Sequence, residues 1–350
     1  MRVEDDAAVG PYERVVHAVD DDSGLRAVVA IRSTALGPAV GGTRFHPYAS
    51  DASAMIDALR LAEGMTLKAA AAGLALGGGK AVIVGDPSRL RSPALWRAYA
   101  QVLDHVGDGY YTAEDVGTTP ADMAALRRLT TQVLGVAEPG SGWDGDPSPY
   151  TARGVVAAMR AVWEAETGLP SLAGARVTVQ GVGKVGGVLA RLLAAEGALL
   201  RLGDLDAARA GALAAELGAE TVPAEAALAD PCDILAPCAM GGVLTPAGVA
   251  GLRCRWVIGA ANNQLSDDAV AGLLAERGIG YVPDFVANAG GLIRVGAQLD
   301  CWEPVRVTEA VDRIGETVAE LIDAVDGGGD TLLAAARRRA LARLAPAPAR

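Results

Sequence analysis

Hydrophobic residues recur with two different periods along the chain, and each change of period marks an expected element. Residues 12–20 and 24–32 are apolar, β-branched runs separated by a short acidic turn, which predicts a β-hairpin. Ser50 precedes a stripe of apolar residues at helical spacing, so we expect a helix over residues 50–65. The same reasoning predicts strands at residues 81–85 and 110–113 and helices at 93–106 and 120–129. The first part of the chain should therefore be an α/β domain.

The second half of the chain alternates short apolar runs with helical patterns. Such alternation is typical of a doubly wound parallel sheet. The expected strands are residues 177–180, 198–203, 232–236, 256–259 and 280–282. Residues 138–149 are rich in turn formers and are expected to be a linker. We therefore expect an N-terminal α/β domain over residues 1–145, a second domain over 146–290, and a helical segment over 291–350 that packs back toward the first domain and ends in a frayed tail.

Composition narrows the class of protein. The 350 residues are 51% hydrophobic and 21% charged, which fits a globular two-domain chain. The net charge of −11 would repel phosphate backbones and anionic lipids, so neither nucleic acid nor a membrane is an expected partner. Residues 234–252 are uncharged and long enough to span a bilayer, but their prolines and glycines favour a buried segment of an α/β domain. The four cysteines show no metal-ligand spacing, which predicts no metal site and buried thiols in a reducing cytoplasm.

A glycine-rich turn follows the strand at residues 177–180. Gly181, Gly183 and Gly186 have the spacing of a dinucleotide-binding turn: the first turns the chain, the second leaves room for a pyrophosphate, and the third lets helix pack on strand. Asp204 stands at the end of the next strand, where a carboxylate can bind both ribose hydroxyls and repel a 2′-phosphate. The sequence therefore predicts a Rossmann domain that binds NAD. The other residues expected at this cofactor site are Val182, Lys184, Val185 and Leu205.

Lysine is scarce, and its positions indicate the chemistry. Lys68, Lys80 and Lys184 are the only lysines of the sequence. A guanidinium stays protonated, whereas an amine can lose its proton when it is buried or lies close to another cation. Lys80 follows three glycines, which we expect to bring the backbone close to a ligand and to aim the amine from the mouth of a strand into a cleft. One of Lys68 and Lys80 could then act as a base while the other holds a carboxylate, and Asp115 could pass protons to a nitrogen.

Several segments resemble the amino-acid dehydrogenases specific for leucine, valine and phenylalanine, in the family that also includes glutamate dehydrogenases. The resemblance runs in register from about residue 10 to 300, and the pairing of GGGK with AEDVG is highly specific. The matching segments are residues 37–44 (GPAVGGTR), 64–68 (GMTLK), 76–80 (LGGGK), 112–118 (TAEDVGT), 145–149 (GDPSP), 236–239 (APCA), 260–263 (AANN) and 288–291 (NAGG).

The resemblance implies reversible oxidative deamination of an L-amino acid to a 2-oxo acid and ammonia with NAD. It implies that Lys68 binds the substrate carboxylate beside the Gly41 and Gly42 backbone, that Lys80 activates water, and that Asp115 relays protons at the amino nitrogen. Met65 and Asn262 would also touch the substrate. The residues implied to contact the cofactor are Thr151, Ala239, Met240, Ala260, Ala261 and Asn262. The resemblance further implies a cleft that closes between the two domains, and a homo-oligomer, either a dimer or an octamer.

The family's side-chain pocket falls on apolar residues of this chain. These residues are Val40, Ala113, Leu134, Leu292 and Val295. Such a pocket has no partner for a polar side chain, which argues against glutamate as the substrate. Leu134 is bulkier than the threonine often found there, which favours valine, leucine or isoleucine over phenylalanine. Arg294 and the tryptophan-bearing turn at residues 140–145 depart from the family pattern, and either could alter specificity or domain closure.

Three alternatives stay open at this point. The first is a phenylalanine dehydrogenase. The second is an inactive relative that binds NAD, but such a protein is expected to have lost Lys80 or Asp115, and both are present. The third is a 2-hydroxy-acid dehydrogenase, which usually needs a histidine as its acid or base. The histidines here, His17, His46 and His105, lie outside the second domain and away from any glycine turn.

Overall fold

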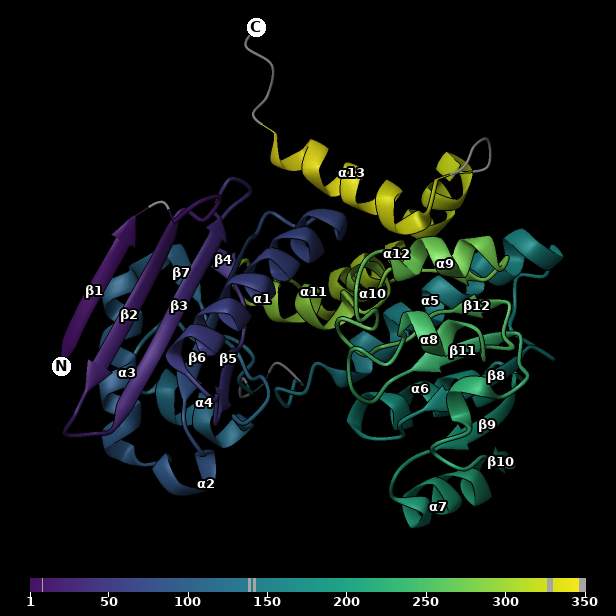
Figure 1. The fold of residues 1–350 in the computed structure, drawn as a ribbon, viewed down its shortest axis with the longest axis horizontal. Coiled ribbons are helices and arrows are strands. Elements are labelled where there is room, and N and C mark those ends of the chain that lie inside the picture. Colours follow the sequence, from purple (N-terminus) through teal and green to yellow (C-terminus); the bar gives the residue numbers. More distant parts are fainter. Residues whose placement is uncertain (8, 138–139, 141–142, 326–329, 346–350) are drawn as a thin grey trace, which may run out of the picture. The chain divides into compact units, whose positions relative to one another are not determined.

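The computed structural model describes residues 1–7, 9–137, 140, 143–325 and 330–345, and the chain divides into two compact units. The first unit comprises Met1–Asp146, Val295–Cys301 and Ala340–Arg350, and the second comprises Pro147–Arg294 and Trp302–Arg339. The expected linker lies partly outside the described residues, as do residues 346–350 of the expected tail. Each unit has its own sheet (Figure 1).

The first unit is built on a seven-stranded mixed sheet in the order β1-β2-β3-β6-β4-β7, with β5 also pairing with β6. Its strands are β1 (Arg2–Ala7), β2 (Arg14–Asp20), β3 (Leu25–Ser33), β4 (Ala39–Val40), β5 (Thr43–His46), β6 (Gly77–Val84) and β7 (Tyr110–Tyr111). Its helices are α1 (Asp51–Ala71), α2 (Pro87–Leu90), α3 (Pro93–Val106), the 3₁₀ turn η1 (Gly107–Gly109) and α4 (Pro120–Arg127). The predicted hairpin is confirmed, because β2 and β3 pair antiparallel from Arg14–Ile31 to Asp20–Leu25.

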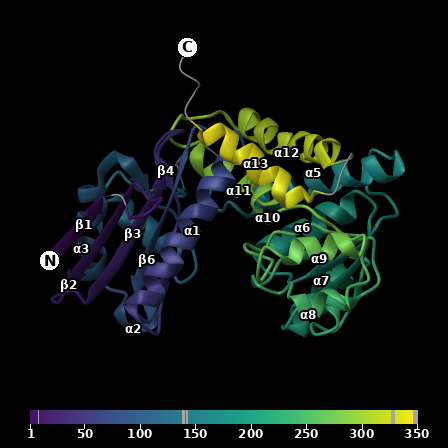
Figure 2. The ribbon, with the colours of Figure 1, turned by 45° about the horizontal axis from the view of Figure 1, so that its top comes forward.

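Helices cover this sheet on both faces. Successive side chains along each strand point to opposite faces of the sheet. On the α3 face, Val16 and Ile83 pack with Tyr99, and on the α1 face, Val15 and Val82 pack on the alanines of α1. Figure 2 shows α1 running across β3 and β6. Small alanines let the helix backbone approach the strands closely, so side chains on the α1 face of β5 and β6 lie within reach of α1.

Two elements differ in length from the prediction. Helix α1 continues to Ala71, beyond residue 65, because residues 69–72 are all alanine and the next glycine with a left-handed backbone is Gly73, with φ of 73°. Strand β6 begins at Gly77, not at residue 81, so the glycine run is paired backbone inside the sheet. Glycine has low strand propensity, and tertiary pairing overrides it here.

The second unit is built on a six-stranded sheet in the order β10-β9-β8-β11-β12-β13, and every pair is parallel. This is the predicted doubly wound arrangement. The strands are β8 (Arg176–Gln180), β9 (Leu199–Gly203), β10 (Glu220–Thr221), β11 (Ile234–Pro237), β12 (Trp256–Val257) and β13 (Gly280–Tyr281). The helices are α5 (Ser148–Thr167), α6 (Lys184–Ala195), α7 (Ala207–Leu217), η2 (Ala227–Ala229), α8 (Pro246–Val249), α9 (Val270–Glu276), α10 (Asp284–Ala287) and α12 (Pro304–Val325). Two further helices, α11 (Gly290–Gly296) and α13 (Leu332–Leu344), begin in the second unit and end in residues of the first.

The uncharged run over residues 234–252 belongs to this sheet. It supplies the buried strand β11 and helix α8, but Met240 in the loop between them is 76% exposed, so the run is not buried throughout. No helix in the described part of the chain is long and apolar enough to cross a membrane.

The cysteines are free thiols, as expected, but only some are buried. Cys232 and Cys254 are buried, Cys238 is half-buried, and Cys301 is exposed, against the prediction for that residue. Burial raises the pKa of Cys238 to about 12 and so keeps it protonated. The described residues contain no cluster of three or more potential metal ligands.

Candidate active site

Gly41 and Gly42 connect β4 to β5 and lie directly against two other candidate residues. The Gly41 amide donates to the Tyr111 carbonyl (3.1 Å), and the Tyr110 hydroxyl donates to the Gly41 carbonyl (2.5 Å). A Cβ on Gly41 would overlap the Gly79 carbonyl, next to Lys80. A Cβ on Gly42 would lie 2.8 Å from the Cβ of Asp115. The two glycines therefore allow three segments to meet at one point.

Lys80 and Asp115 form an ion pair at this point. Their Nζ and Oδ2 atoms are in direct contact, and Lys80 is only 6% exposed. Thr118 holds the backbone of Asp115 in place. The Asp115 amide donates to Thr118 Oγ1 (2.9 Å), and the Thr118 hydroxyl donates to the Asp115 carbonyl (2.9 Å). The structure thus brings the two expected catalytic residues together in the first unit.

The carboxylate of Asp115 has a second cation beside it. Arg44 Nε lies 3.5 Å from Asp115 Oδ2. Burial raises the pKa of Asp115, but the charges of Lys80 and then Arg44 outweigh burial and hold that pKa below its usual value. Asp115 is therefore a carboxylate at neutral pH.

The glycines before Lys80 were expected to make room for a ligand, but they make room for other parts of the protein. A Cβ on Gly78 would overlap the Thr66 backbone of α1, and a Cβ on Gly79 would lie 2.8 Å from the Tyr110 ring. These glycines seat α1 and Tyr110 against β6, so their close neighbours are protein atoms. Lys80 also lies within β6, opposite Ala30, and not at the mouth of the strand.

Lys68 and Met65 lie on the C-terminal part of α1, on either side of Thr66. Both residues are half-buried, and Lys68 is in the last turn of the helix. Because Thr66 packs on Gly78, two residues before Lys80, this turn of α1 lies against the same stretch of β6. The sequence suggested that a second ammonium would face Lys80, whereas the partner in contact with Lys80 is the Asp115 carboxylate.

Three of the expected side-chain pocket residues gather around Gly135. A Cβ built on Gly135 would be 3.5 Å from Ala113 Cβ and 3.9 Å from Val295 Cγ2, and Leu134 is the preceding residue. Val40 is buried in β4, and Leu292 is buried within the second unit. Leu134 also borders a pocket of about 240 Å³ with Arg127 and Gln298 among its neighbours.

The glycine turn of the second unit has the geometry that a dinucleotide needs. Gly181 has φ of 93°, and its Cβ would lie 2.7 Å from Ala239 Cβ, so only glycine fits. A Cβ on Gly186 would overlap the Gly181 carbonyl, whereas Gly183 has no atom nearer than 4.0 Å. The turn therefore packs tightly at its first and third glycines and is open at its second, at the N-terminus of α6. Val182, Lys184 and Val185 belong to the same turn and helix start.

Asp204 ties this turn to the next strand. Its Oδ2 accepts the Val182 amide (2.8 Å) and its Oδ1 accepts the Asp206 amide (2.9 Å). Each carboxylate oxygen has a second lone pair, so both can still accept a hydroxyl. Leu205 beside it is 96% exposed. Gly181 and Asp204 follow β8 and β9, at the carboxyl ends of parallel strands, where α/β sheets bind their ligands.

The remaining cofactor candidates follow β11 and β12. Ala239 touches Gly181, while Met240 is exposed. Ala260 and Ala261 are buried, and Asn262 is exposed. Thr151 lies in the first turn of α5, where its hydroxyl donates to the Pro147 carbonyl (3.1 Å) and packs against Gly291.

Arg294 does not face solvent. It is 8% exposed, and its guanidinium lies 5.8 Å from the centre of the Tyr150 ring. The guanidinium therefore lies over the Tyr150 ring at the start of α5, within the second unit.

Two residues that belong to the quoted motifs received no role from the sequence. Arg44 contacts Asp115, as described above. Asn288 is buried and donates from Nδ2 to Asn262 Oδ1 (2.9 Å) and to the Ala260 carbonyl (3.1 Å).

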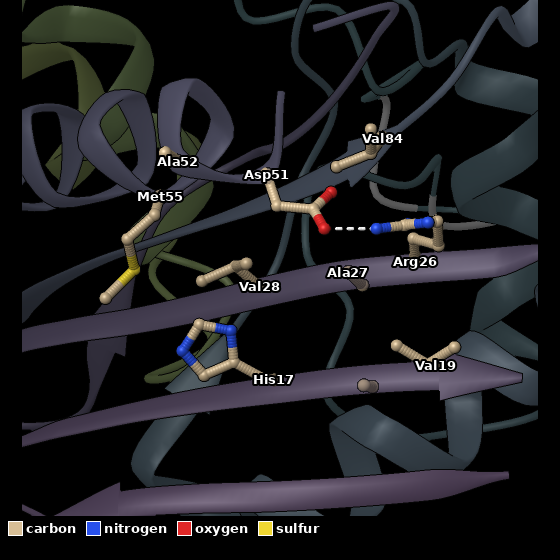
Figure 3. A pocket seen from close by; sticks show the side chains of 10 residues that line it. His17, Val19, Arg26, Ala27, Val28, Asp51, Ala52, Met55 and Val84 are labelled. Atoms are coloured by element: carbon tan, nitrogen blue, oxygen red, sulfur yellow. Dashed lines mark hydrogen bonds and ion pairs between the residues drawn. The ribbon is translucent and has the colours of Figure 1, made fainter. Parts of the chain in front are cut away.

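A pocket of about 260 Å³ in the first unit contains none of these residues. It lies between β2, β3 and the start of α1, and its side chains include His17, Arg26, Asp51 and Met55 (Figure 3). Arg26 forms an ion pair with Asp51 across it.

Comparisons with known proteins give the relationships of the chain. Residues 13–132 match the family model described as "Glu/Leu/Phe/Val dehydrogenase, dimerisation domain", and residues 202–348 match "Glutamate/Leucine/Phenylalanine/Valine dehydrogenase". The chain is 42% identical to a leucine dehydrogenase of Bacillus cereus over 95% of its own length and 91% of that protein. It is 43% identical to a valine dehydrogenase of Streptomyces albus, over 97% and 94% of the two lengths. The crystal structure of L-tryptophan dehydrogenase from Nostoc punctiforme superposes with a TM-score of 0.82 at 35% identity, covering 95% of this chain and 96% of that one.

Proposed function

Because the chain belongs to the glutamate, leucine, phenylalanine and valine dehydrogenase family, we propose that it catalyses the reversible oxidative deamination of an apolar L-amino acid with NAD. The overall reaction converts the amino acid, water and NAD⁺ into the 2-oxo acid, ammonium, NADH and a proton. The observation that carries the proposal is the buried Lys80–Asp115 ion pair, seated against Gly41 and Gly42.

Substrate binding is assigned to the end of α1 and the glycine pair. The Lys68 ammonium is proposed to hold the substrate carboxylate, with the Gly41–Gly42 backbone and Met65 beside it. Lysine suits this role as a compact point charge. Asn262, oriented by Asn288, is proposed to contact both substrate and cofactor through its side-chain amide.

Proton transfer is assigned to the ion pair. Loss of hydride from Cα and of a proton from the amino nitrogen gives an imine, which water attacks before ammonia leaves. Asp115 is proposed to accept and return the proton at nitrogen. Lys80 is proposed to release its ammonium proton to solvent, as the net proton of the reaction, and then as a neutral amine to take the proton from the attacking water. The direct contact between Nζ and Oδ2 lets a proton pass between the two groups without an intervening water.

The residues of the second unit fit a nicotinamide cofactor. The open position at Gly183 accommodates a pyrophosphate against the first amides of α6, and Asp204 has free lone pairs for a ribose diol. When bound, NAD supplies the hydride acceptor. The carboxylate of Asp204 disfavours a 2′-phosphate, so NAD is proposed over NADP. Thr151, Ala239, Met240, Ala260 and Ala261 are proposed to line the nicotinamide–ribose part.

The proposed substrate has a branched aliphatic side chain. Val40, Ala113, Leu134, Leu292 and Val295 are all buried and apolar, so a charged side chain would lose its hydration without gaining a partner. Leucine at position 134 fills volume near Gly135, which favours valine, leucine or isoleucine. A phenylalanine dehydrogenase is the second candidate, since the family description includes that substrate.

A substrate panel tests the proposal. Initial rates of NADH formation are measured with leucine, valine, isoleucine, phenylalanine and glutamate, and the reverse reaction with the matching 2-oxo acids and ammonia. We expect the highest kcat/KM with a branched-chain substrate, and a much lower value when NADP replaces NAD. A clear preference for phenylalanine would support the second candidate, and no turnover with any amino acid would refute both.

The assignment of Lys80 has its own test. Lys80→Ala should lower kcat by about 10²-fold or more, because it removes a proton acceptor from the reacting centre. Substrate binding, measured by calorimetry in the presence of NADH, should persist through Lys68. An unchanged kcat in Lys80→Ala would contradict the role assigned to Lys80.

A further inference from the structure

The carboxylate of Asp115 is held by more than Lys80. Arg44, on β5, also lies beside Asp115 Oδ2, with its Nε 3.5 Å from that oxygen. The residues on either side of Arg44, Thr43 and Phe45, are buried toward α3, so alternation along β5 turns Arg44 to the α1 face of the sheet. That is the face to which Lys80 also points from β6, since its neighbour Ala81 packs toward α3.

Arg44 is itself fixed by helix α1. Its Nη1 donates to Asp57 Oδ2 (2.9 Å), and the Tyr48 hydroxyl donates to the same oxygen (2.6 Å). A guanidinium presents several donors in one rigid plane, so one arginine can address Asp57 and Asp115 together. Hydrogen bonds and ion pairs therefore connect the helix to the candidate catalytic carboxylate, through Tyr48, Asp57, Arg44, Asp115 and Lys80.

We infer that Arg44, anchored by Asp57, is a positioning residue that holds the Asp115 carboxylate in place beside Lys80. This inference rests on the proposed role of Asp115 in the amino-acid dehydrogenase reaction. Arg44 does not need to touch the substrate: it keeps one carboxylate oxygen in a fixed direction and keeps the group ionised. A carboxylate that could rotate freely would spend less time within reach of the substrate nitrogen.

Electrostatics support the same arrangement. Burial raises the pKa of Asp115, but the charges of Lys80 and then of Arg44 outweigh burial and hold that pKa below its usual value. The pKa of Arg44 is raised because Asp115 and Asp57 outweigh its burial. The titratable groups around Asp115 are Lys80 of β6, Arg44 of β5, Tyr110 of β7, Tyr48 after β5, Asp57 of α1 and the neighbouring Glu114.

The test compares kcat, KM and the pH profile of kcat/KM for leucine in the full-length enzyme and five variants. Arg44→Gln removes the charge, and we expect kcat to fall roughly 10- to 100-fold through misplacement of Asp115, with a smaller change in KM. Removing the charge of Arg44 makes the Asp115 carboxylate easier to protonate, so the acid limb of the profile should shift to higher pH by about one unit. Arg44→Lys keeps the charge and should leave the limb near its wild-type position, while kcat recovers only in part.

Asp57→Asn tests the anchor, because it leaves Arg44 in place but weakens its hold. We expect a fall in kcat smaller than that of Arg44→Gln. Arg26→Gln is the matched control, because it also breaks an arginine–aspartate pair between the sheet and α1, the pair with Asp51 drawn in Figure 3. Lys80 is paired with Ala30 of β3, four residues along that strand from Arg26. Arg26→Gln should leave both kcat and the acid limb unchanged.

The outcomes separate this inference from the proposed function. If Asp115→Asn abolishes turnover but Arg44→Gln and Asp57→Asn retain wild-type kcat and pH profile, the positioning role is wrong and the proposed function stands. If Asp115→Asn itself turns over normally, the proposed mechanism fails. Should Arg44→Gln not fold, as judged by circular dichroism, Arg44→Lys and Asp57→Asn decide the question in the same way.

Discussion

A single methyl group at residue 42 would reach the candidate carboxylate. A Cβ there would lie 2.7 Å from the Glu114 carbonyl and 2.8 Å from Asp115 Cβ, and neither atom is the end of a flexible side chain. Gly42→Ala should therefore push Asp115 away from Lys80 and lower kcat by about 10²-fold. Steady-state kinetics measure this. Gly109→Ala is the control, because no atom lies within 4 Å of its Cβ, and it should keep wild-type kcat. A fully active Gly42→Ala enzyme would contradict the placement of Asp115.

The lowered pKa of Asp115 predicts a pH-dependent contribution to stability. A carboxyl whose pKa is lower in the folded state stabilises the fold above its ordinary pKa of 3.8, and this contribution is lost as pH falls through the folded value. Asp115→Asn should lower the free energy of unfolding at pH 7 by about 1–3 kcal/mol. The difference from wild type should shrink as pH drops below about 4. Urea unfolding across that range tests it, with the exposed Asp21→Asn as control; a pH-independent difference would count against the prediction.

At the scale of elements, α1 and β6 depend on one glycine contact. A Cβ on Gly78 would overlap the backbone of Thr66, so neither element could keep its position. Gly78→Ala should destabilise the first unit by about 3 kcal/mol or more. Gly64→Ala is the matched control on the same helix: it has open space around it and should raise stability by about 0.5–1 kcal/mol. Urea midpoints of both variants measure this, and equal midpoints would exclude the contact.

Element types could be predicted from the sequence more securely than their ends. The β2–β3 hairpin, α3 and the parallel sheet of the second unit follow from local periodicity and turn residues, and the structure confirms them. The start of β6 could not be predicted, because three glycines become a strand only through pairing with β3 and packing on α1. Likewise Cys301 looks like a buried thiol in sequence, and its exposure depends on tertiary position.

The candidate site shows the same division between local pattern and tertiary contact. The spacing of Gly181, Gly183 and Gly186 predicts their three different environments, because the motif is local. Local spacing could not predict that Asp115 is the partner of Lys80. The two residues are 35 positions apart, and they come into contact because Gly42 leaves room for Asp115. The role of Arg44 could not be predicted for the same reason, since nothing in the residues around it indicates a contact with Asp115.

At the scale of the whole molecule, the chain should assemble. Residues 13–132 match a family model described as a dimerisation domain, and we propose a homo-oligomer, either a dimer or an octamer. Light scattering coupled to size exclusion should therefore give a mass that is a multiple of 35.5 kDa and that does not change on dilution through the micromolar range. A stable species of 35.5 kDa that still deaminates leucine would show that assembly is dispensable.

The carboxylate that follows β9 has a consequence for anyone who wishes to change the coenzyme. Asp204 accepts the Val182 amide and the Asp206 amide, so it holds the glycine turn in place in addition to its proposed role toward a ribose. Replacing Asp204 with an apolar residue to admit a phosphorylated coenzyme would leave the Val182 amide, just after β8, without its hydrogen-bond acceptor. A successful redesign has to provide another acceptor for that amide. Without one, we expect the variant to bind both coenzymes more weakly, because the turn is no longer held in place.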